Sequence, residues 1–83
     1  MLKPSQLQEL PIIAQLACDC LNDWGYNELI VKSIAWDNIK ERWIVGFIID
    51  SRTSKELSIA IEPCYKSYRY RGVVFPDELT RTT

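Results

Sequence analysis

The sequence predicts an α+β fold, a two-layer sandwich in which one N-terminal helix packs on a three- or four-stranded antiparallel meander. Three observations predict it. An apolar stripe with helical spacing comes first, apolar runs with strand-like alternation follow, and short polar stretches separate these runs. A chain of 83 residues is expected to form one domain, over residues 1–76, followed by a flexible C-terminal tail at 77–83.

The N-terminal part has the spacing of an amphipathic helix. Its apolar residues recur at steps of three and four, at Leu7, Leu10, Ile13, Ala14, Ala17, Leu21 and Trp24. Pro11 would cost about 3 kcal/mol inside a helix, because it removes a backbone donor and its ring clashes with the preceding turn. We therefore expect a short turn at residues 4–9, a main helix from Pro11 to about Asp23, and Gly25 as the left-handed residue that ends it.

The central strand is expected at residues 42–50, the most apolar run of the chain. The bulkier of its two faces is predicted to pack on the helix, and it holds Trp43, Val45, Phe47 and Ile49. The opposite face holds Ile44, Gly46 and Ile48, and the missing side chain of the glycine indicates a bulge or a close neighbour there.

Two or three further strands are expected around it. Residues 28–36 form the first, before a polar turn at 37–41, and alternation does not assign its core face because neither face is polar. Residues 56–62 alternate cleanly and end at Pro63. Residues 65–75 are the candidate for a fourth strand, in which Gly72 favours a bend.

Catalysis has little support, because the chain contains no histidine. The Ser-His and Cys-His nucleophile pairs are therefore excluded, and we assign no catalytic residue. Two pairs of carboxylates, Asp19 with Asp23 and Asp37 with Glu41, are interpreted as surface charges and turn formers.

No metal, cofactor or small-molecule site is predicted. Cys18 and Cys20 lack the spacing of a metal-binding pair, no histidine can complete a zinc site, and no glycine-rich phosphate loop exists. An odd number of cysteines implies no disulfide framework, so a cytoplasmic setting is expected. The net charge is −1, and no apolar run approaches the roughly 20 residues of a membrane span.

The segment 65–72 alternates tyrosines with cations. Its candidate partner-binding residues are Tyr65, Lys66, Tyr68, Arg69, Tyr70 and Arg71. On a strand, the tyrosines at 68 and 70 would share one face and the arginines at 69 and 71 the other. Tyrosine and arginine are enriched in protein-binding hot spots. The same residues could stack bases and pair phosphates of single-stranded nucleic acid, or could simply protect an edge strand.

A second candidate surface is the sheet face that a single helix leaves uncovered. If the helix covers only one face, Ile44 and Ile48 remain on the other, and we expect Ile30, Ile34 and Trp36 beside them. Of these, Trp36, Ile44 and Ile48 are the candidate partner-binding residues. A bare apolar face usually finds a partner, and self-association would bury it.

These patterns favour a small non-enzymatic protein-binding or accessory module, either monomeric or homodimeric. The alternative is a single-stranded nucleic-acid-binding protein that uses segment 65–72. No membrane partner and no small-molecule substrate is expected.

Overall fold

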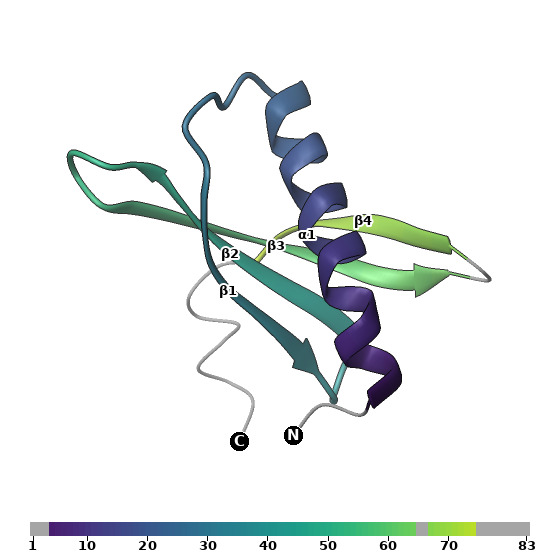
Figure 1. Ribbon diagram of the computed structural model, residues 1–83. Coiled ribbons are helices and arrows are strands. Elements are labelled where there is room, and N and C mark those ends of the chain that lie inside the picture. Colours follow the sequence, from purple (N-terminus) through teal and green to yellow (C-terminus); the bar gives the residue numbers. More distant parts are fainter. Residues whose placement is uncertain (1–3, 65–66, 75–83) are drawn as a thin grey trace.

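The computed structural model describes residues 4–64 and 67–74. One helix, α1 (Pro4–Asp23), lies across one face of an antiparallel sheet whose strand order is β1-β2-β3-β4 (Figure 1). The strands are β1 (Ile30–Asp37), β2 (Arg42–Asp50), β3 (Lys55–Cys64) and β4 (Ser67–Val74). The predicted α+β arrangement is confirmed, with four strands in the sheet. The tail predicted at 77–83 lies outside the described residues.

The helix α1 runs without a break through Pro11, so the predicted interruption at this residue is wrong. Pro11 is exposed, whereas Ile13, Ala17 and Leu21 are fully buried against the sheet. Leu10 also packs on this core, from the N-terminal side of the proline. Packing therefore holds both halves of α1 on the sheet, and tertiary contacts outweigh the local cost of the proline.

The C-terminus of α1 ends as the sequence predicts. The backbone N–H of Gly25 donates to the carbonyl of Asn22 at 3.0 Å, and that of Tyr26 donates to the carbonyl of Leu21 at 3.1 Å. These two bonds form a Schellman motif. Gly25 has a φ of 97°, a conformation that glycine adopts without steric cost.

The core lies between α1 and the two central strands. Trp43, Val45 and Phe47 of β2 are fully buried, together with Ile59 and Ile61 of β3, and they meet the buried stripe of α1. The predicted inward face of β2 is thus confirmed. Each fully buried aliphatic or aromatic side chain of this kind contributes about 1.5–3 kcal/mol.

A β-bulge in β1 changes which side chains face the helix. Val31 pairs with Phe47, whereas Ser33 already pairs with Gly46, so Lys32 is an extra residue. The extra residue reverses the alternation, and Ile34 and Trp36 come to lie on the helix side of the sheet. Their predicted place on the uncovered face is therefore wrong. Trp36 meets Trp43 edge-on, with ring centroids 5.3 Å apart.

A second bulge has the same effect in β4. Tyr70 pairs with Ile61 and Gly72 pairs with Ala60, which leaves Arg71 as the extra residue. Beyond it, Val74 reaches the face opposite α1 and packs with Ile44 and Ala60. Gly72 has a φ of 128°, in agreement with the bend expected there.

Two strand ends also differ from the prediction. β1 begins at Ile30, two residues later than expected, and β3 continues to Cys64 through Pro63. The pairing of β2 with β3 ends at Trp43 and Ile61. Pro63 lies beyond it, so the missing N–H of the proline breaks no hydrogen bond to β2. It is still paired with Tyr68 of β4.

Replacing Pro11 by alanine should stabilise the protein. Pro11→Ala restores the missing helical N–H at an exposed position, so the free energy of unfolding should rise by roughly 1–3 kcal/mol. Denaturant titration measures this change. Gln8→Ala is the control, because glutamine at an exposed helical position is already a good helix former. A Pro11→Ala protein no more stable than the wild type would contradict the strain at this residue.

Gly46 is needed because its neighbours leave little room. A Cβ at this position would lie 2.8 Å from Ser33 Oγ and 3.4 Å from Ser58 Oγ. Gly46→Ala should therefore lower the free energy of unfolding by about 1 kcal/mol, because Ser33 has to leave its rotamer. In a Ser33→Ala background the same change should cost less, or stabilise the strand. Equal costs in the two backgrounds would rule out this contact as the reason for the glycine.

Candidate partner-binding surfaces

The tyrosines of β4 are turned toward the helix. The Tyr68 hydroxyl donates to Glu9 Oε1 at 2.6 Å, and the Tyr70 ring meets Trp24 edge-on with centroids 5.1 Å apart. Both tyrosines are half-buried against the core between α1 and the sheet. They connect β4 to residues near both ends of α1.

The titration of these tyrosines reflects the same packing. Burial, reinforced by the hydrogen bond to Glu9 and by its charge, raises the pKa of Tyr68 to about 12. Burial, with a smaller effect of Cys20, raises the pKa of Tyr70. The rings therefore have a structural use in the folded chain.

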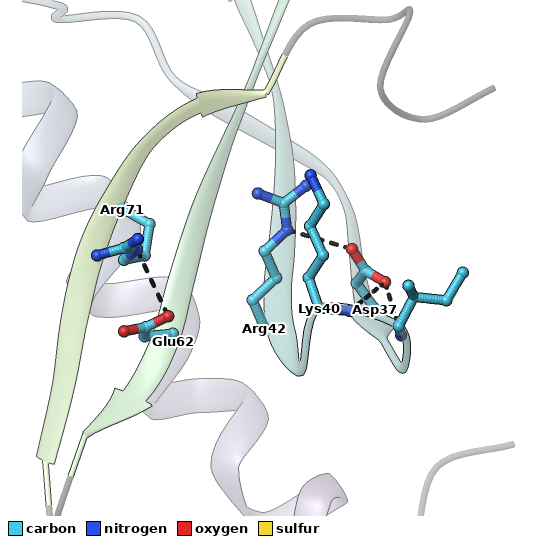
Figure 2. Close-up of polar contacts among 6 residues, drawn as sticks. Asp37, Lys40, Arg42, Glu62 and Arg71 are labelled. Carbon is cyan, nitrogen blue, oxygen red and sulfur yellow. Dashed lines mark hydrogen bonds and ion pairs between the residues drawn. The ribbon is translucent and has the colours of Figure 1, made fainter. Parts of the chain in front are cut away.

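The arginines of β4 lie on the opposite face, as the sequence predicts, and both reach one carboxylate. Arg69 Nη2 is 2.9 Å from Glu62 Oε1. Arg71 Nε is 3.4 Å from Glu62 Oε2 (Figure 2). Such exposed pairs stabilise a fold by no more than about 1 kcal/mol. They do reduce the positive charge that β4 presents to a partner. Tyr65 and Lys66, the other predicted residues of this segment, lie outside the described residues.

The face of the sheet opposite α1, which we call the open face, has small side chains at its centre. One row across the strands is Ser33, Gly46 and Ser58, and the next is Ala35, Ile44 and Ala60. Ile44, Ala60 and Val74 are only 7%, 1% and 3% exposed, and Ile48 is half-buried. Ile30, which pairs with Ile48 on this face as predicted, is 52% exposed. The centre of the open face is therefore less apolar and less accessible than the sequence indicates, and an exposed apolar side chain lies at the β1 edge.

Charged pairs lie at both ends of the open face. Arg42 Nε is 3.2 Å from Asp37 Oδ2, and Asp37 Oδ1 accepts the backbone N–H groups of Ile39 and Lys40 at 3.0 and 3.3 Å (Figure 2). Burial opposes the charge of Asp37, but these three donors outweigh it and lower the pKa of the carboxyl group. At the other end, Lys32 pairs with Glu56.

The outer edge of β1 is a surface that the sequence argument missed. Among the described residues, β1 pairs only with β2, so its other edge carries no strand. Most of its side chains are exposed, and Ile30 and Val31 are 52% and 39% exposed. The signal in the sequence is the lack of a polar face in a strand that comes first in a meander, because such a strand lies at an edge.

The described residues offer no constellation for catalysis or metal binding. Within residues 4–64 and 67–74, no three side chains of the histidine, cysteine, aspartate or glutamate types come together as metal ligands do. Burial raises the pKa of the thiols of Cys18 and Cys20, and neighbouring aspartates raise it further. The described part of the chain also has no helix of the length and apolar character that crossing a membrane requires.

Comparison of the chain with models of known families, with curated proteins and with solved structures gives no match.

The contact between Tyr68 and Glu9 should be measurable as stability. Tyr68→Phe removes a short hydrogen bond to a carboxylate and should lower the free energy of unfolding by about 1–2 kcal/mol at neutral pH. Because the pKa of about 12 in the folded state lies above the ordinary tyrosine value of 10.0, this contribution to stability is complete below pH 10.0. It disappears as the pH rises through the folded-state pKa.

Denaturant titrations at neutral pH and at increasing alkaline pH test both statements. The fall in stability toward high pH should be shallower in Tyr68→Phe than in the wild type. Tyr26→Phe is the control, because Tyr26 also packs on the core but its hydroxyl bonds to no side chain within residues 4–64 and 67–74. Parallel pH dependences in the wild type and Tyr68→Phe would show that the hydroxyl does not contribute.

Proposed function

We propose that this protein is a non-enzymatic protein-binding module that accepts an extended strand of a partner at the outer edge of β1. The observation that carries the proposal is the difference between the two edges of the sheet. Strand addition uses the unpaired N–H and C=O groups of an edge strand for affinity, and its alternating side chains for specificity.

The β1 edge has the properties that strand addition needs. Its only charged residues are Lys32 and Asp37, and both are engaged, with Glu56 and Arg42. After the bulge at Lys32, the register from Ser33 to Asp37 is regular. An apolar, regular edge strand that has no second strand beside it in the described part of the chain is a ready template for pairing with another chain.

The β4 edge carries the devices that discourage pairing. Arg69 and Arg71 are exposed on it, the bulge at Arg71 interrupts its register, and Gly72 bends the backbone directly after the bulge. Charges and bulges at an edge oppose the approach of another strand. This contrast supports β1, and not the Tyr/Arg segment, as the binding edge.

Single-stranded nucleic-acid binding through segment 65–72 is the alternative, and the contacts of β4 favour it less. Stacking of bases needs aromatic faces that are free, and phosphate binding needs cations that are free. Tyr68 and Tyr70 pack on α1, and Glu62 takes both arginines.

We further propose that the module acts in the cytoplasm. The support for this is that Cys18, Cys20 and Cys64 are all free thiols, which a reducing compartment preserves.

A pull-down with matched edge variants tests the binding function. Tagged wild-type chain and two double variants, Ser33→Lys/Ala35→Lys on β1 and Arg69→Ala/Arg71→Ala on β4, are used as baits in cells that produce the protein. Proteins bound at the β1 edge should be retained by the wild type and by the β4 variant and lost from the β1 variant, because lysines on an edge oppose strand addition. Retention of every bound protein by the β1 variant would contradict the proposal.

Titration with a labelled single-stranded oligonucleotide at low salt distinguishes nucleic-acid binding from protein binding. The proposal expects no binding in the micromolar range. Binding that weakens steeply with added salt and disappears in Arg69→Ala/Arg71→Ala would instead support the nucleic-acid function.

A further inference from the structure

The two ends of strand β1 carry charges of opposite sign. A cation, Lys32, lies near its start and an anion, Asp37, is its last residue, with uncharged residues between them. Two copies of β1 aligned in parallel would bring like charges together. Two copies aligned antiparallel keep the two Lys32 side chains at opposite ends of the pair, and likewise the two Asp37 side chains, so like charges do not meet.

We propose that the strand bound at the β1 edge is β1 of a second copy of this chain, antiparallel to the first about a twofold axis at Ala35. The two four-stranded sheets then form one continuous sheet. This inference rests on the proposed function, and it names the partner. A twofold axis requires a surface that is complementary to itself, and the antiparallel arrangement of β1 meets this requirement.

The faces of β1 determine where the axis lies. Residues directly opposite each other in an antiparallel pair point to the same face of the sheet. Ile34 and Trp36 lie on the helix side, and Ala35 lies between them on the open face. An axis at Ala35 therefore sets Ile34 opposite the partner's Trp36, and Trp36 opposite the partner's Ile34, which makes two pairs of a β-branched and an aromatic side chain.

The small exposed side chain of Ala35 suits this axis. Two alanines facing each other leave room for the backbones to approach at the spacing of an antiparallel pair. The same register sets Ser33 opposite the partner's Asp37, a hydroxyl donor facing a carboxylate. An axis at Ile34 would instead place the two bulky Ile34 side chains opposite each other. It would also place Trp36 opposite the irregular backbone at the partner's Lys32.

Opposite charges introduced at the axis test the inference. Light scattering on the purified full chain should give a mass twice the 9.7 kDa of one chain. Ala35→Lys and Ala35→Glu should each give the mass of one chain, because like charges then face each other directly. An equimolar mixture of the two variants should regain the doubled mass, since each lysine now faces a glutamate.

Ser67→Lys and Ser67→Glu are the matched controls, because Ser67 is exposed on the opposite edge strand, and both should keep the doubled mass. Circular dichroism and thermal unfolding verify that the Ala35 variants are folded, as expected at an exposed position. A wild type with the mass of one chain up to millimolar concentration would overturn the second copy as partner, while loss of other bound proteins from the β1 variant in the pull-down would still support the proposed function. A doubled mass that persists in both Ala35 variants, or that the mixture does not restore, would overturn the axis at Ala35.

Discussion

The packing of one helical stripe on β2 is the interaction on which the rest of the structure depends. Ile13, Ala17 and Leu21 meet Trp43 and its neighbours in a core with no exposed surface. This contact determines which face of the sheet is covered, and it stabilises α1 as one continuous helix through Pro11. It also positions α1 for the contacts of Tyr68 and Tyr70, so the C-terminal strand depends on the same helix.

The two edge strands adapt to this core by the same device. Each has a bulge whose extra residue is a cation, Lys32 in β1 and Arg71 in β4, and each cation pairs with a glutamate of β3. The bulge in β1 places Ile34 and Trp36 against the helix-side core, and the bulge in β4 places Val74 on the face opposite α1. The bulge in β1 lies near its start and leaves a regular edge beyond it. The bulge in β4 lies near the middle of the strand and leaves no comparable edge.

The packing of α1 on the sheet and the bulges in the edge strands explain which parts of the fold could be predicted from the sequence. The core face of β2, the glycine stop of α1, the crowding at Gly46 and the opposed faces of Tyr68 and Arg69 were predictable, because each depends on local alternation or on one backbone conformation. The continuous helix through Pro11 was not predictable, because its stability comes from contacts with strands that are distant in the sequence. The faces of Ile34 and Trp36 were not predictable either, because simple alternation of side chains along a strand does not predict where a bulge inserts an extra residue.

The candidate surfaces illustrate that composition alone does not reveal which side chains already have partners within the chain. The Tyr/Arg segment has the residue types of a binding hot spot, yet its described tyrosines and arginines already have partners within the chain. The β1 strand has an ordinary composition, and what distinguishes it from β4 is a regular register along an edge that has no strand partner among the described residues. An edge of this kind leaves polar backbone groups without a strand partner along an apolar strip. A partner strand would supply hydrogen bonds and cover apolar surface in the same step, and this makes β1 the surface with the most to gain from binding.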